Sequence, residues 1–154
     1  MFREICNMTQ MEFDALIQDT TKQIAEDIAW SEDEDHSPTV EFRVEVESEP
    51  GYPIFIRGSY NVLAASLSFA LIHRGSGRIY ALDMGKEHHN PSCENVGEVH
   101  KHRWTDLFAD KEAYVPQLTA PVSQPIEVWK EFCNEAKIKH EGVMHPLPPI
   151  QLFL

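Results

Sequence analysis

The chain has 154 residues, the usual length of one folded domain, and 42% of them are hydrophobic and 25% charged. Its 13 Lys and Arg residues against 25 Asp and Glu residues give a formal net charge of -12, which disfavours binding to the phosphates of nucleic acid. We therefore expect a single domain over residues 1–154 that buries its own core, and neither a disordered nor a fibrous protein.

The first predicted element is an amphipathic helix over about residues 10–30. Thr9 and Glu12 form a capping box at its start. Apolar residues then recur at helical spacing, at Phe13, Leu16, Ile17, Ile24 and Ile28. The acidic run at residues 32–35 ends this helix. It lacks the alternating ligands and central glycine of a calcium loop, which favours a solvated loop.

From residue 39 the apolar period changes to two, which predicts a half-buried strand over about residues 40–47. Three more strands are predicted in "YPIFIRGSY", "SLSFALIHR" and "RIYALDM", and a Gly-Ser-Gly turn at residues 75–77 joins the last two. A fifth strand, "EVHKHRW" at residues 98–104, follows an Asn-Pro loop. This order is typical of an antiparallel meander.

The last predicted element is a helix that begins with Ser123 as its cap and Pro125 in its first turn. One apolar stripe runs along it to about Lys139 and includes Cys133, which we expect in the core. Gly142 and the prolines after it end this helix. The predicted fold class is α+β, an antiparallel sheet of four to five strands covered by an N-terminal and a C-terminal helix.

The apolar tail "PLPPIQLFL" would be costly to leave in water. It either packs back on its own sheet or docks on a neighbour, which predicts a homo-oligomer or a protein partner. The chain has three cysteines and no CxxC pair, which argues against disulfides and against a cysteine-rich zinc site. No apolar run reaches the roughly 18 residues of a membrane span, and no secretion signal is evident. We expect a cytoplasmic protein without a membrane partner.

The stretch richest in reactive side chains is "HHNPSCENVGEVHKHR", residues 88–103, with four histidines. If residues 98–104 form a strand, alternation places His100 and His102 on one face and Arg103 on the other. Two histidines at positions i and i+2 of a strand are able to bind one transition metal ion, because both rings then project to the same side. The stretch therefore predicts a histidine-lined pocket.

Neighbouring residues supply further ligands. His88 or His89, in the loop before the strand, would add a third nitrogen, and Glu98, Asp83 or Glu87 would add an oxygen. The predicted metal ligands are His88, His100 and His102, and the predicted cofactor is a divalent transition metal. The wider ligand-binding set is His88, His89, His100, His102 and Arg103.

Two other interpretations of the stretch stay open. In the first, the histidines perform metal-free acid-base catalysis such as RNA cleavage, with Arg103 or Lys101 to hold the oxyanion. In the second, they hold the loop in shape, and Asn90 and Asn95 bond to their own backbone. A histidine next to a cysteine is able to activate the thiol as a nucleophile, which is one interpretation of Cys93 beside His88 or His89. No third member of a triad is nearby in the sequence, which favours an incidental thiol.

The run from "FIRGSYNVLAAS" to "GEVHKHRWTD", followed by "EVWKEFCNEAKI", resembles a family of small uncharacterised prokaryotic proteins, a domain of unknown function with an H-x-N and an H-x-H-R element. The resemblance covers the middle and C-terminal two-thirds of the chain. Met84 and Trp104 depart from the pattern. The matching positions are Leu82, Gly85, His88, His89, Asn90, Gly97, His100, His102 and Arg103. The resemblance implies that the histidine-rich stretch matters, and it implies no particular activity.

The leading functional hypothesis is a pocket that binds a divalent metal or a small anionic ligand. If the pocket hydrolyses a substrate, the metal would lower the pKa of a bound water while Glu98 orients or deprotonates that water. A rival hypothesis is a non-enzymatic interaction module of a small bacterial two-component stress or defence system, whose acidic surface or tail contacts a protein. A third is a metal-free ribonuclease.

Overall fold

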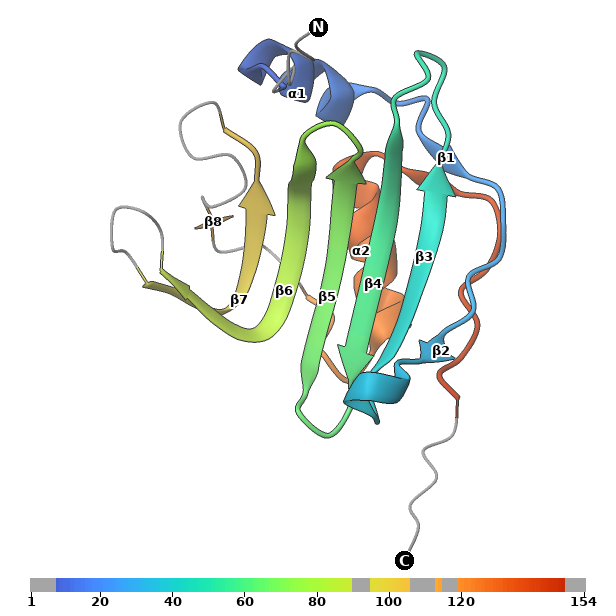
Figure 1. Ribbon diagram of the computed structural model, residues 1–154, viewed down its shortest axis with the longest axis vertical. Coiled ribbons are helices and arrows are strands. Elements are labelled where there is room, and N and C mark those ends of the chain that lie inside the picture. The colour runs from blue at the N-terminus through green and yellow to red at the C-terminus, as the bar shows by residue number, and fades with distance from the viewer. Residues whose placement is uncertain (1–7, 90–94, 106–112, 115–118, 149–154) are drawn as a thin grey trace, which may run out of the picture.

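A computed structural model describes residues 8–89, 95–105, 113–114 and 119–148, and gives only the backbone of residues 86–89, 95–98 and 113–114. Seven antiparallel strands form one sheet in the order of the sequence, which makes it a meander (Figure 1). These strands are β2 (Ser31–Glu32), β3 (Val40–Val46), β4 (Ile54–Asn61), β5 (Ser66–His73), β6 (Gly77–His89), β7 (Asn95–Arg103) and β8 (Ala113–Tyr114). Two further short strands, β1 (Gln23–Ile24) and β9 (Lys139–His140), pair in parallel.

The predicted α+β class is confirmed, with helices α1 (Gln10–Gln18) and α2 (Pro125–Ala136) beside the antiparallel sheet. The five long strands β3 to β7 are the five that alternation predicted. The sheet has more strands than predicted, because the two-residue strands β2 and β8 extend its edges. Strands this short leave almost no periodicity in the sequence.

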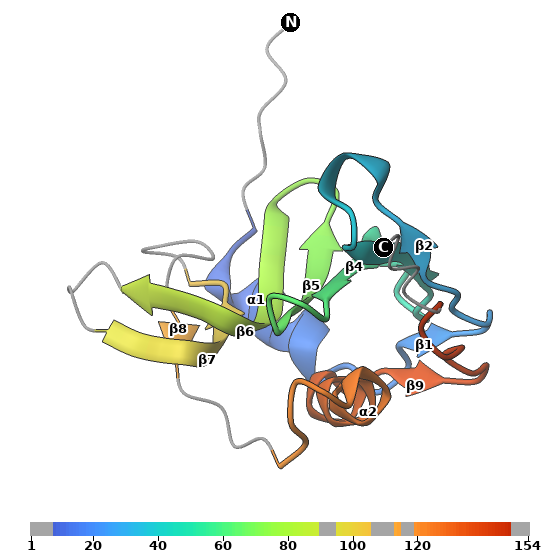
Figure 2. The ribbon, with the colours of Figure 1, turned by 90° about the horizontal axis from the view of Figure 1, so that it is seen from below.

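Helix α2 covers one face of the sheet, behind the strands in Figure 1 and along one side of them in Figure 2. The ring of Trp129 lies 5.1 Å from that of Phe69 on β5 and 5.6 Å from that of Phe42 on β3, centroid to centroid. Phe132 and Cys133 are buried beside it, which confirms the core position predicted for Cys133. Aromatic burial on this face supplies much of the packing that holds the helix to the sheet.

The prediction of a helix over residues 10–30 is wrong beyond Gln18. Thr9 caps the helix as predicted, because its hydroxyl accepts a hydrogen bond from the amide of Glu12 and donates one to the Glu12 carboxylate. After Gln18 the buried Lys22 turns back, and its Nζ donates to the carbonyl oxygens of Leu16 (2.6 Å), Ile17 (3.1 Å) and Asp19 (2.6 Å). These bonds satisfy carbonyls that the next helical turn would otherwise have used.

Two apolar residues that fitted the helical spacing therefore lie in extended chain. Ile24 is in β1, and Ile28 forms an isolated bridge with Met144, so both bury their side chains through pairing with the C-terminal segment. The helical period over residues 24–28 was a coincidence of spacing, since two residues four apart also fit an extended chain that buries every second side chain.

Both ends of α2 also differ from the prediction. Its N-cap is Gln124, which makes no capping hydrogen bond with its side chain, and not Ser123. The helix stops at Ala136 because Lys137 adopts a left-handed conformation (φ 58°), well before Gly142. Ile138 is then buried and β9 pairs with β1, so tertiary pairing ends this helix earlier than the sequence signals do. The tail beyond residue 148 lies outside the described residues.

Strand β6 is longer than predicted, because it continues past Met84 to His89. Gly85 makes this continuation possible. It has φ +85°, and a Cβ atom at this position would overlap the carbonyl oxygen of Ala65. The pairing of β6 with β7 shifts register beyond Met84, so His88 and His89 lie at the end of a strand and not in a loop.

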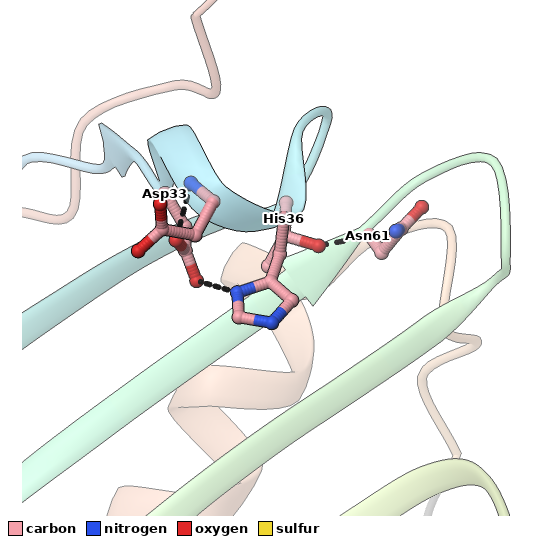
Figure 3. A network of polar contacts seen from close by, with 5 residues as sticks. Asp33, His36 and Asn61 are labelled. Carbon is pink, nitrogen blue, oxygen red and sulfur yellow. Dashed lines mark hydrogen bonds and ion pairs between the residues drawn. The ribbon is translucent and has the colours of Figure 1, made fainter.

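The acidic run ends in a short 3-10 helix, η1 (Glu34–His36), and forms a local polar network (Figure 3). Asp33 caps it by accepting from the amide of Asp35, and its other oxygen lies 3.0 Å from Nδ1 of His36. Asn61, at the end of β4, donates to Thr39 across the strand pair. The aspartate thus has local partners, as expected of a solvated turn. No helix in the described segments is long and apolar enough to cross a membrane.

Candidate metal centre

The side chains of Asp83, His100 and His102, here called the Asp83 cluster, converge on the sheet face opposite α2. Asp83 on β6 lies directly across from His100 on β7. The Oδ2 atom of Asp83 is 3.0 Å from Nε2 of His102 and 3.4 Å from Nε2 of His100. The two rings are 4.9 Å apart at an angle of 72°. One carboxylate oxygen therefore faces the Nε2 atom of each histidine.

Two more side chains hold Asp83 in place. The hydroxyl of Ser68, directly across from Asp83 on β5, donates to Oδ1 at 2.7 Å. The guanidinium of Arg78 lies 3.6 Å from Oδ2. The cluster is nearly closed to solvent, since Asp83 is 5% exposed and each histidine 2%. Such burial excludes competing water and fixes the rotamers that a binding site needs.

Asp83 is ionised despite its burial. Burial by itself would raise the pKa of this carboxyl, but hydrogen bonds from His102 and Ser68, and the charges of His102 and Arg78, outweigh burial and hold the pKa of Asp83 well below its usual range. A metal ligand must be deprotonated to bind, so this carboxylate is ready to coordinate.

The spacing of the cluster suits a metal ion. Ligands about 2.0–2.1 Å from one ion lie about 2.9–3.4 Å from each other at tetrahedral or octahedral angles. The two distances from Asp83 Oδ2 to the histidine nitrogens fall in this range. The three ligand atoms all lie within 4.8 Å of one another. Two histidines and one carboxylate form a set that zinc and iron(II) accept, with coordination positions left for water.

The structure brings together part of the predicted site. His100 and His102 share a face, as alternation predicted, and Asp83, one of three predicted oxygen ligands, completes their cluster. Arg103 lies across from Tyr80 and lines a different hollow with Glu135 of α2. Lys101 is buried on the same side as Arg103 and pairs with Glu135, so the sheet separates both cations from the histidines.

The other predicted ligands fall outside the described side chains. Of His88, His89, Glu87 and Glu98 the structure describes only the backbone, and Cys93 lies outside the described residues. Sequence reasoning missed Ser68 and Arg78. Alternation on β5 places the side chain of Ser68 on the face away from the core residues Leu67 and Phe69. Only the strand register shows that Ser68 contacts Asp83.

A comparison with protein-family models matched residues 8–138 to a family of unknown function, DUF6978. The chain belongs to this family. The match confirms the resemblance to a domain of unknown function and extends it over α1, which the resemblance had left out. A search of curated proteins found no match, and neither did a search of solved structures. The chemistry of this DUF6978 member therefore has to be inferred from the Asp83 cluster itself.

Proposed function

We propose that the protein binds one divalent transition metal ion through Oδ2 of Asp83 and Nε2 of His100 and His102. The observation that carries this proposal is the approach of two histidine nitrogens to one buried carboxylate oxygen, at 3.0 and 3.4 Å. A buried aspartate between two histidines satisfies hydrogen bonds in the metal-free protein and coordinates an ion without a large rearrangement.

Three protein ligands leave at least one coordination position for water or a substrate atom. A bound ion would lower the pKa of that water and supply the nucleophile of a hydrolysis, which is the reaction that the site suits best. Ser68 would act as the outer partner that orients Asp83, because its hydroxyl donates to the second carboxylate oxygen.

The test is metal binding to the purified protein, untagged so that no histidine tag competes. After removal of metal with a chelator, we expect zinc, manganese, iron(II) or nickel to bind at one equivalent in calorimetry and to raise the melting temperature. The double variant His100→Ala, His102→Ala should lose this binding.

The matched control is His36→Ala, which removes an exposed histidine that also contacts an aspartate, Asp33, at 3.0 Å. This variant should bind metal like the wild type. No stoichiometric binding of any of the four ions by the wild type would reject the proposal, and so would equal losses in the double variant and the control.

The two rival hypotheses stay predictions. Metal-free RNA cleavage needs a cation beside the histidines, and Arg78 is a cation next to the cluster, whereas Arg103 faces the other side of the sheet. It predicts RNA cleavage that persists in chelator. An interaction module that works through the apolar tail predicts dimerisation that deletion of residues 147–154 abolishes.

A further inference from the structure

The sheet face that carries the Asp83 cluster also has a hollow of about 540 Å³ over β3, β4 and β5. Figure 1 views the sheet from this side. The lining of the hollow includes the small side chains of Ser59, Ser68 and Ala70, the two arginines Arg43 and Arg57, and one carboxylate, Glu41. Its size is that of pockets which hold small molecules.

Arginines gather on this face of an otherwise acidic protein. Three guanidinium groups surround the ring of Phe55, with Arg43 at 3.9 Å, Arg74 at 5.6 Å and Arg57 at 5.7 Å from the ring centroid. With Arg78 at the Asp83 cluster, four of the six arginines in the chain lie on this face, although the net charge of the chain is -12.

The strand register makes this gathering costly. Arg43 on β3 lies directly across from Arg57 on β4, and like charges in directly opposed positions destabilise a strand pair. Glu45 pairs with Arg43 at 3.8 Å and with Arg74 at 2.5 Å, which offsets part of the repulsion. Among the described side chains, no carboxylate pairs with Arg57, whose partner is the face of Phe55. An anion held by Arg57 and Arg43 would remove the remaining repulsion.

The hollow adjoins the Asp83 cluster through Ser68, which lines the hollow and donates its hydroxyl proton to Asp83. The pairs Ser59–Ser68 and Ser68–Asp83 form one continuous row across the sheet. A molecule whose charged group lies at Arg57 would therefore extend over small side chains toward Asp83.

We propose that this hollow is a binding site for a phosphorylated small molecule, whose phosphate group lies between Arg57 and Arg43. A guanidinium donates two parallel hydrogen bonds to phosphate oxygens, and a phosphomonoester carries enough charge to pair with both arginines. The hydroxyl of Ser59 is the neighbouring donor, because that of Ser68 is committed to Asp83. Glu41 also lines the hollow, directly across from Ser59 and two residues before Arg43 on β3, and its repulsion of the anion favours a phosphate position nearer Arg57.

The experiment is calorimetric titration of chelator-treated protein with inorganic phosphate and with glycerol 3-phosphate. Both should bind saturably, and Arg57→Ala should weaken the binding of each at least tenfold, while Arg57→Lys restores part of it. Lys130→Ala, which removes an exposed cation on α2, is the control and should change affinity less than twofold.

This test separates the hollow from the metal site. Because the protein is freed of metal before the titration, phosphate binding that appears only after metal is added would overturn the arginine site. Persistence of binding in the double variant His100→Ala, His102→Ala would support it. No saturable binding of either phosphate compound, an equal loss in Lys130→Ala, or binding of a single-stranded oligonucleotide alone would also overturn it.

Discussion

His102 contacts Asp83 along a diagonal of the sheet: its Nε2 atom lies 3.0 Å from Oδ2 of Asp83, although the residue directly across from His102 is Ala81. His100 occupies the position directly across from Asp83 and is the more distant of the two histidines, at 3.4 Å. The methyl group of Ala81 leaves room for the ring of His102 to reach over it. A small residue beside the carboxylate is thus part of what lets two histidines meet one oxygen.

Replacing Asp83 with Asn should destabilise the metal-free protein by about 3 kcal/mol, because two buried histidines and Arg78 lose their shared counter-charge. Urea unfolding in chelator measures this difference. Asp27→Asn is the control, since Asp27 is 57% exposed and lies 3.8 Å from His145. The hydrogen bond that Asp27 Oδ1 accepts from the amide of Val143 is one that the asparagine oxygen also accepts. It should cost less than about 1 kcal/mol. Equal costs for the two variants would show that the Asp83 contacts contribute nothing beyond a surface pair.

Removing Arg78 should strengthen metal binding about tenfold, because its guanidinium lies 3.6 Å from the oxygen that the ion would use. The measurement is competition between wild type and Arg78→Ala for one metal ion in the presence of a chelating dye. Arg78→Lys keeps the charge and should bind metal like the wild type. Weaker metal binding by Arg78→Ala would mean that the arginine supports the site and does not compete for it.

Gly85→Ala should destabilise the fold by more than about 3 kcal/mol, since φ is +85° and the added methyl would overlap the backbone at Ala65. The comparison that isolates the overlap is Gly51→Ala, where φ is +76° and a Cβ would meet nothing within 4 Å. That variant should cost about 1 kcal/mol. Thermal unfolding measures both, and a cost at Gly85 no larger than at Gly51 would contradict the close approach of β6 to Ala65.

Lys22→Met should cost about 2–4 kcal/mol at pH 7, because three carbonyls at the end of α1 lose their donor. Lys139→Met, at a side chain 73% exposed, is the control and should have little effect. Unfolding in urea gives both values.

The same pair of variants reports on pH. Burial lowers the pKa of Lys22 from 10.5 to about 8, against the opposing charge of Asp19. Between these values the unfolded chain binds more protons than the folded protein, so the folded protein gains stability as the pH rises through the window. Since methionine does not titrate, the advantage of wild type over Lys22→Met should grow from pH 8 to pH 10. Burial also lowers the pKa of Lys101 to about 8, but Lys101 is present in both proteins, so its contribution cancels from the difference between them. A constant difference would show that Lys22 is not desolvated.

Local periodicity was enough to predict the five long strands, the presence of both helices and the shared face of His100 and His102. Each of these depends on which residues within one segment alternate between core and solvent, and that information is in the segment itself. Local periodicity also placed Arg103 on the sheet face away from the histidines, and the structure has Arg103 on that face.

The tertiary structure decided everything that depends on partners far along the chain. The first helix ends at Gln18 because Lys22 is buried against its last carbonyls, and α2 ends early because β9 pairs with β1. The register of β5, β6 and β7 sets Ser68, Asp83 and His100 in one row across the sheet. Alternation within a strand assigns each side chain to a face, whereas its neighbour on that face is set by strand pairing and by the bulges that shift the pairing. The sequence alone therefore placed the two histidines on one face, and only the fold selected Asp83 as their carboxylate.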